Sequence, residues 1–340
     1  QELEEAGVDL SSPLFKFSGR GTTTAFTTII VSDSEFTRTC IHTPGTCGEL
    51  TVDDVSEVDM DEVFANVIHL HSDCRHTDAS LALVIEARKR GITVSVDAEK
   101  DRNIQSQHGL LELATTLFTN STQLQGYFDT RTEELEQKHK QQSLPKATLE
   151  CASVVDKLVV AQTLAASLNP SSFYLRWFGE SQLEKDVVIT KGSMGALRVK
   201  PESFVVENSI TEKNSIAITS DDDDICIEQH SIAPHEGNMK TRYKVQTAGV
   251  LKDVAIVDTT GAGDAFIGGY LLASLAAPGG CRPQLALNFG AWVGGRKLGG
   301  PGARSALPRA FEVDELLGRT PSDVDQSLQG MLGSFGAMVE

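Results

Sequence analysis

The chain has 340 residues, of which 40% are hydrophobic, so it is long enough to bury a sizeable core in one large domain or two smaller ones. Its formal net charge of −17 argues against a general role in binding nucleic acid, because contact with a phosphodiester backbone requires a basic face. No apolar stretch reaches the roughly 18–20 residues of a membrane helix, and the six cysteines have neither zinc-binding nor paired spacing. We expect a cytoplasmic protein with no nucleic-acid or membrane partner.

The N-terminal segment predicts a helix end followed by a β-hairpin. Residues 1–10 are acidic where a secretory or organellar leader would be basic, and they read as the tail of an amphipathic helix that stops at Gly7. Residues 26–32 and 38–42 are rich in β-branched side chains and flank a polar turn. This pattern predicts two antiparallel strands.

The middle of the chain alternates between strand and helix patterns, as a parallel-sheet α/β protein should. The predicted strands are residues 67–71, 93–97, 117–120 and 187–190, and the first predicted helix is residues 77–90. Polar residues follow several of these strands, and open α/β sheets bind their ligands at the carboxyl ends of strands. We therefore expect a ligand site at this edge of the sheet.

Two segments interrupt the alternation. Residues 129–145 are highly charged and read as a solvated surface excursion. Residues 207–249 lack sustained periodicity and predict a surface insertion that holds a β-hairpin at most. The aspartate run at residues 221–224 lacks the ligand spacing of a calcium-binding loop, so we interpret it as solvated.

The strand at residues 187–190 ends in a glycine-containing turn. Thr190 offers a hydroxyl at the strand end, and Gly192 and Gly195 would let the backbone approach a phosphate or ribose closely. Taken alone, the pattern fits an ordinary glycine hairpin equally well.

The most informative segment is residues 258–267, with the sequence DTTGAGDAFI. Gly261, Ala262 and Gly263 leave backbone amides uncovered just before an apolar helix predicted at residues 265–277, which makes an anion hole. Asp264 would repel a phosphate there, but it fits a base that takes a proton from an attacking hydroxyl. The alternative is a glycine turn that caps a helix, with Asp264 as a first-turn charge.

The string DTxGAGD, followed by an aromatic residue and an apolar helix, resembles the C-terminal signature of the PfkB/ribokinase family of carbohydrate and nucleoside kinases. The resemblance implies an α/β, ribokinase-like three-layer α/β/α fold with a mainly parallel sheet and a small β lid. It also implies ATP and Mg²⁺ as cofactors, a small sugar as substrate, and a possible homo-oligomer formed through the lid.

The resemblance also assigns roles to individual residues. The nucleotide-binding residues would be Asn120, Thr190, Gly192, Gly195, Asn288 and Arg38. The family places Asn-x-x-Glu at the end of a strand to arrange hydrated Mg²⁺, whereas this chain has Gln123 in place of the Glu, so Mg²⁺ would be held through water more weakly. Asn120 could instead be a plain cap between strand and helix.

A monovalent cation site is implied beside the same motif. After a helix predicted at residues 285–298 comes a glycine-rich turn, and the family can hold a cation such as K⁺ between it and the signature. The candidate residues are Asp258, Thr260, Gly302 and Ser305. A plain loop explains the turn equally well.

Three segments resemble one subgroup of this family. Residues 38–42, 94–100 and 289–297 are similar to ketohexokinases and plant-type pfkB sugar kinases. In that subgroup Arg38 would contact a phosphate from the lid, a role that suits a guanidinium group. Alternatively, Arg38 pairs with Asp33 or Glu35 within the hairpin.

The family pattern also sets the expected domain boundaries. Residues 1–45 would be a partial lid and connecting segment, residues 46–318 the nucleotide-binding core, and residues 319–340 a C-terminal tail. The family begins with a strand carrying a sugar-binding acid and a glycine-rich loop with an Asn, and neither appears before Gly19. We expect that the N-terminal part of the pattern is missing.

The sequence thus predicts an ATP-dependent carbohydrate kinase with Asp264 as its general base. A nucleoside kinase of the same fold is the first alternative. A catalytically silent nucleotide-binding regulatory protein is the second; Gln123 favours it, and the presence of Asp264 counts against it.

Overall fold

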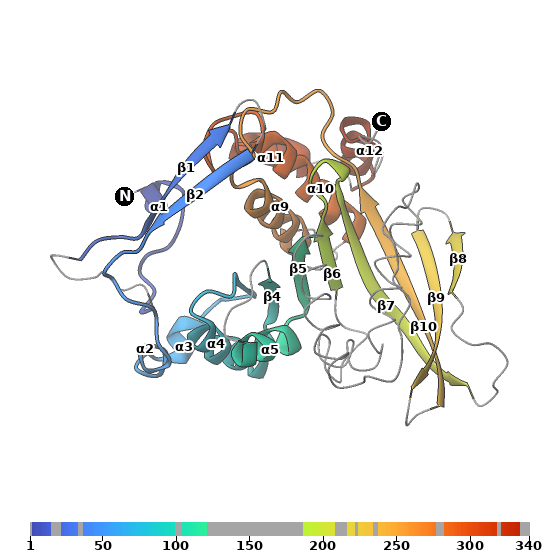
Figure 1. Cartoon of the computed structure of the whole chain (residues 1–340), viewed down its shortest axis with the longest axis horizontal. Coiled ribbons are helices and arrows are strands. Elements are labelled where there is room, and N and C mark those ends of the chain that lie inside the picture. Colours follow the sequence, from blue (N-terminus) through green and yellow to red (C-terminus); the bar gives the residue numbers. More distant parts are fainter. Residues whose placement is uncertain are drawn as a thin grey trace. The chain divides into compact units, whose positions relative to one another are not determined.

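The computed structural model describes residues 2–14, 22–32, 37–98, 104–120, 186–207, 216–221, 224–233, 237–276, 282–317 and 321–333 (Figure 1). The chain divides into two compact units. The first comprises Gln1–Val96 with Asp101–Ala114, and the second comprises Asp97–Lys100 with Thr115–Glu340. Each is described by itself below. Among the described residues, no helix has the length and apolar character needed to cross a membrane.

The first unit contains short helices and two pairs of strands. Its elements are α1 (Glu2–Glu5), β1 (Phe26–Ser32), β2 (Thr37–Thr43), α2 (Val52–Ser56), α3 (Met60–Val63), β3 (His69–Ser72), α4 (Thr77–Lys89), β4 (Thr93–Asp97) and α5 (Ile104–Leu113). The predicted hairpin is present, because β1 pairs with β2 antiparallel. Strands β3 and β4 are parallel neighbours, as the strand–helix–strand pattern predicted.

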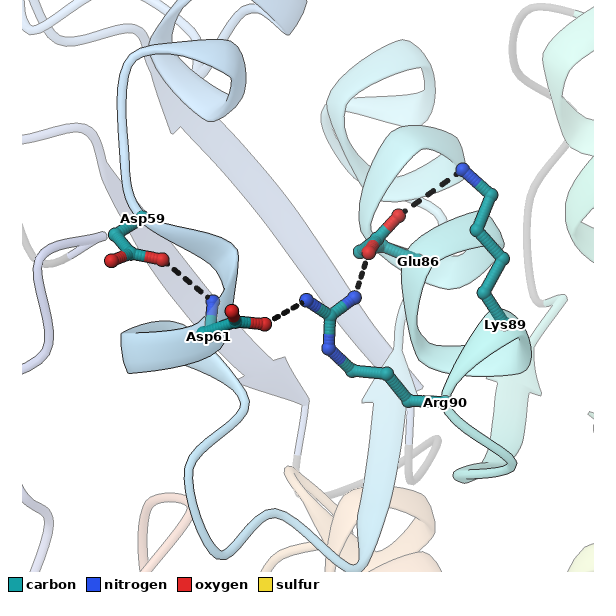
Figure 2. A network of polar contacts seen from close by, with 5 residues as sticks. All are labelled: Asp59, Asp61, Glu86, Lys89 and Arg90. Carbon is teal, nitrogen blue, oxygen red and sulfur yellow. Dashed lines mark hydrogen bonds and ion pairs between the residues drawn. The ribbon is translucent and has the colours of Figure 1, made fainter.

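Helices α3 and α4 are connected by a polar network, which Figure 2 shows. The Asp59 carboxylate accepts the amide of Asp61 (2.9 Å) and so caps α3. Arg90, just after α4, pairs with Asp61 across the two helices and with Glu86 in its own helix, and Glu86 also accepts from Lys89. The Asp61 side chain is 90% exposed, so this network adds little to stability.

The parallel pair β3–β4 carries a half-buried histidine. His69 lies within 2.8 Å of the hydroxyl of Thr93 through Nδ1 and within 2.8 Å of the fully buried Ser95 hydroxyl through Nε2. Burial, followed by the charge of His71, lowers the pKa of His69 from 6.5 to about 4. The neutral ring is therefore the form that this strand pair accommodates.

We expect the stability of this strand pair to fall as the pH drops from about 6.5 to about 4. The folded-state pKa of His69 lies below that of the unfolded chain, so protonation favours unfolding across this window, and the loss is complete below the folded-state value. Urea unfolding monitored by hydrogen exchange of the β4 amides at pH 7.5 and pH 5 measures this loss of stability. His69→Gln should flatten the difference, and an unchanged pH dependence in that variant would contradict the assignment.

The second unit carries the longer sheet. Its strands are β5 (Thr116–Asn120), β6 (Asp186–Thr190), β7 (Ala196–Glu207), β8 (Ile216–Asp221), β9 (Asp224–Ala233) and β10 (Gly237–Ala248). Their order is β5-β6-β7-β10-β9-β8, with β5 and β6 parallel and the remaining neighbours antiparallel. The mixed sheet packed with helices confirms the α/β fold class.

The structure differs from the sequence prediction over residues 207–249. Instead of a hairpin at most, three antiparallel strands continue the sheet beyond β7. Strand β10 pairs with β7, and β9 and β8 follow in turn; such backbone pairing leaves no mark on hydrophobic periodicity. The other predicted excursion, residues 129–145, lies outside the described residues.

The helices of the second unit are α9 (Ala262–Ala276), α10 (Pro283–Lys297), α11 (Ala310–Leu317) and α12 (Pro321–Met331), with a single turn of 3-10 helix, η2 (Gly192–Met194). Helices α9 and α10 lie side by side against the sheet (Figure 1). Phe118 of β5 meets Tyr270 of α9 edge to face at 5.3 Å, which ties the first strand of this sheet to the motif helix.

Helix α12 differs from the predicted tail at residues 319–340. Val324 and Leu328 are 2% and 0% exposed and belong to the core that α9 and α10 form. These two residues are one helical turn apart and present a single apolar stripe, a spacing that the sequence analysis did not weigh.

Glycines fix the distance between α9 and α10. A Cβ on Gly269 would lie 2.8 Å from Cγ2 of Val293, and one on Gly290 would lie 2.9 Å from the carbonyl oxygen of Phe266. At the start of α9, a Cβ on Gly294 would lie 3.1 Å from the carbonyl oxygen of Ala262. Small residues on the two helices therefore allow their backbones to approach, and this contact positions the first turn of α9.

Candidate functional site

The loop before α9 is organised around Asp258. Its Oδ1 accepts the amide of Thr260 at 2.8 Å, which closes a turn of the kind that Asp favours. Gly261 follows with φ +77°, a backbone conformation that residues with a side chain rarely adopt. The turn then enters α9, which begins at Ala262, three residues earlier than the sequence predicted.

The sequence predicted an anion hole at the first turn of α9, and the backbone amides there are as follows. The amide of Ala265 donates to the carbonyl of Gly261 at 2.9 Å, so it is the first amide of the helical ladder. The amides before it have no acceptor within the helix, and of these Ala262 donates to the carbonyl of Thr259 at 3.2 Å. The amides of Gly261 and Gly263 are thus the better placed to bind an anion.

Asp264 lies in this same first turn, and its side chain is exposed. An acidic group at a helix N-terminus interacts favourably with the helix dipole. Its exposure leaves the carboxylate accessible to a hydroxyl group of a bound molecule. The arrangement can therefore hold an anion on backbone amides and accept a proton beside it.

The glycine-rich turn after α10 packs against this loop. Oδ2 of Asp258 accepts the amide of Gly302 at 2.7 Å, and the carbonyl of Leu298 accepts the amide of Val257 at 2.8 Å. A Cβ on Gly261 would lie 2.9 Å from Cβ of Ala303, so only glycine fits here. The position of the loop before α9 is therefore set by the turn at residues 298–303.

Hydrogen bonds hold Asp258 in its charged form. The amide of Thr260 makes the largest contribution, and the amide of Gly302 and the charge of Lys297 add to it, so the pKa of Asp258 lies below its ordinary value. Both carboxylate oxygens already accept backbone amides, which makes Asp258 a loop-fastening residue.

Lys297 is a buried cation beside this loop that the sequence predictions did not include. Its side chain is 0% exposed, and its ammonium donates to the carbonyl oxygens of Asp258 (3.0 Å) and Gly300 (3.1 Å). Burial lowers its pKa, while Asp258 acts in the opposite direction. The available signal was a Lys at the end of an apolar helix, directly before a glycine-rich turn.

The strand ends bring together two predicted nucleotide-binding residues. Asn120 and Thr190 are register partners at the carboxyl ends of the parallel strands β5 and β6, and the Thr190 hydroxyl lies 3.5 Å from the carbonyl of Thr119. The turn that follows has Gly192 at φ +56° and Gly195 at φ +96°. A Cβ on Gly195 would overlap the carbonyl of Ala248, so packing within the unit also requires this glycine.

The remaining predicted residues are placed as follows. Asn288 is 3% exposed in α10, and its Oδ1 accepts from Gln284 at 3.0 Å, so the described structure holds it within the core. Ser305 donates its hydroxyl to the carbonyl of Pro301. Arg38 lies in β2 opposite Val31, but its side chain is not among those described, and Gln123 lies outside the described residues.

A metal centre built from side chains is absent from the part of the chain that the structure describes. No group of three or more His, Cys, Asp or Glu side chains converges there.

Comparison with known proteins agrees with this geometry. Residues 239–310, which contain most of β10, the loop, α9 and α10, match the model of the pfkB family carbohydrate kinases. No curated protein matches the chain.

Solved structures of similar fold include two ribokinases. The enzyme from Cryptococcus neoformans var. grubii serotype A, in complex with ADP, is 14% identical with a TM-score of 0.54, over 87% of this chain and 72% of that one. The enzyme from Giardia lamblia is 17% identical with a TM-score of 0.50, over 88% of this chain and 72% of that one. The fold is thus ribokinase-like.

Proposed function

We propose that this protein transfers the γ-phosphoryl group of ATP to a hydroxyl group of a small sugar. The observation that supports this most is the start of α9, where uncovered amides adjoin the exposed carboxylate of Asp264. This turn lies within the range that matches the pfkB family carbohydrate kinases. A glycine turn that only caps a helix could also carry an acid in its first turn, so the Asp264 variant described in the Discussion is needed to separate the two roles.

In the proposed reaction the chain binds, orients and removes a proton. The amides of Gly261 and Gly263 hold the oxygens of the γ-phosphoryl group, with the dipole of α9 behind them. Asp264 takes the proton from the sugar hydroxyl as its oxygen attacks phosphorus in line, and the bond from phosphorus to the β–γ bridging oxygen breaks to release ADP. Positioning and charge stabilisation supply most of the rate enhancement.

The nucleotide would extend from this turn along the strand ends. Asn120 and Thr190 are neighbours there in one register, at the edge where open α/β sheets bind ligands. Mg²⁺, when bound with ATP, would neutralise charge between the phosphates, with Gln123 as the residue that the family resemblance places near its water shell. We retain Asn288 as a prediction for the adenine side.

The class of phosphoryl acceptor and the oligomeric state are proposed from fewer observations. The ketohexokinase-like segments favour a sugar over a nucleoside, and Arg38 of the hairpin would contact a phosphate. Phe26, Ile30 and Ile41 of the hairpin are 58%, 54% and 52% exposed, which supports an oligomer formed through it.

ATP with Mg²⁺ should raise the melting temperature of the chain, because a ligand that binds only the folded state stabilises it by mass action. Gly263→Val should abolish the shift, since the added side chain would occupy the phosphate position. Differential scanning fluorimetry at millimolar ATP measures both. The matched control is Gly268→Val in the same helix, where a Cβ meets nothing within 4 Å. If ATP does not shift the melting temperature of a folded sample, the proposed nucleotide site is wrong.

A panel of sugars and nucleosides then separates the kinase from its alternatives. Product formation from a sugar supports the proposal, and product formation from nucleosides alone would replace it by a nucleoside kinase. An ATP-induced shift without turnover of any acceptor would favour a silent nucleotide-binding protein.

A further inference from the structure

The ammonium of Lys297 lies where the two loops of the site meet. It donates to the carbonyl of Asp258 in the loop before α9 and to the carbonyl of Gly300 in the turn after α10, 3.0 Å and 3.1 Å away. The side chain is 0% exposed, and lysine is almost never fully buried unless its charge is compensated. Its position at the C-terminal end of α10 adds the favourable dipole of that helix.

Carbonyl oxygens that converge from two turns are also what a bound K⁺ requires, and the family resemblance implies such a cation between these loops. The four candidate residues fit it poorly. Both oxygens of Asp258 accept amides, and the hydroxyl of Ser305 donates to Pro301. Among the side chains of these candidates, the buried hydroxyl of Thr260 has no hydrogen-bond partner, and one hydroxyl does not make a cation site.

We propose that Lys297 is a built-in cation that takes the place of a monovalent ion, fastening the turn after α10 to the loop that carries the anion hole. Together with the bond from Gly302 to Asp258, it holds the two loops at a fixed distance. That distance sets the contact of Gly261 with Ala303. It therefore also sets the direction in which the backbone N–H groups at the start of α9 point. Lys297 is proposed as a positioning residue, because its ammonium donates to the backbone carbonyls of Asp258 and Gly300.

The loop-fastening role itself does not depend on the proposed kinase function, whereas its effect on ATP binding does. The test therefore begins with the unliganded protein. Melting temperatures are compared in K⁺ and in tetramethylammonium at equal ionic strength, for the wild type and for Lys297→Ala, Lys297→Met and Lys297→Arg. Tetramethylammonium is too large to enter a carbonyl cage.

We expect the wild type to melt at the same temperature in both salts. Lys297→Ala should melt on the order of 5–10 °C lower in tetramethylammonium, and K⁺ should restore much of the loss by binding the vacated carbonyls. Lys297→Met should be lowered similarly in both salts, because its side chain fills the space without supplying charge. Lys297→Arg should retain part of the wild-type stability.

The outcomes decide the proposal as follows. A wild type whose melting temperature is higher in K⁺ than in tetramethylammonium would overturn the proposal. Equal K⁺-induced changes in the melting temperatures of Lys297→Ala and Lys297→Met would also overturn it, even if both variants fold poorly. In a second step, the ATP-induced shift of Lys297→Ala should return with K⁺. If the wild type shows no ATP-induced shift, the proposed function fails while the salt dependence still tests Lys297.

Discussion

Asp264→Asn should lower turnover about 10²- to 10⁴-fold, the range typical of losing a general base. Asn keeps the size and much of the hydrogen bonding of Asp, but it cannot accept the proton of the attacking hydroxyl. The affinity for ATP should hold or rise, because a negative charge beside the γ-phosphate has been removed. Steady-state kinetics with the best acceptor, together with an ATP titration by fluorimetry, measure the two effects.

The control for this experiment is Asp323→Asn, the same change in the first turn of α12 at an exposed position. It should leave turnover near its original value. If Asp264 only capped its helix, Asp264→Asn would lower the melting temperature and spare turnover. Near-normal turnover of every substrate found would make the proposed mechanism wrong.

Arg198→Met should destabilise the folded protein by about 3–5 kcal/mol, because it removes one partner of a buried ion pair. Arg198 of β7 donates to Oδ2 of Asp186 at 2.7 Å and to Oε1 of Gln246 at 2.7 Å, and its side chain is 4% exposed. The variant would leave a carboxylate and an amide oxygen without their donor, both poorly solvated. Urea denaturation measures the free energy of unfolding.

The surface pair of Arg296 and Glu312 provides a matched control. Its atoms are also 2.7 Å apart, but the side chains are 44% and 27% exposed. Arg296→Met should therefore cost no more than about 1 kcal/mol. Equal losses in the two variants would show that burial is not the cause. Adding Asp186→Asn to Arg198→Met should recover part of the loss, because the uncompensated charge is then removed.

The parts of the site that lie within one short segment were predictable from the sequence. The motif at residues 258–267 predicted a loop of amides at a helix start, and the structure has that helix, with Gly261 at positive φ. The strand predicted at residues 93–97 coincides with β4. Such features follow from local backbone preferences and periodicity, which act over a few residues.

Contacts between distant segments were not predictable. Residues 207–249 gave no periodic signal, and the strands there are held by pairing of β10 with β7, of β9 with β10 and of β8 with β9. The start of α9 at Ala262 depends on the close approach of Gly294 from α10. These features come from packing, and nothing within the segments themselves encodes the partner.

The sequence by itself determined which groups the proposed site has: a carboxylate, a run of bare amides and a helix start, all within ten residues of chain. The tertiary structure decided what holds that chemistry in place. Lys297 reaches the carbonyl of Asp258 from 39 residues away, and Arg198 reaches Gln246 from 48. A lysine or arginine reads as a solvated surface charge in sequence, because burial and a distant acceptor arise only when the chain is folded.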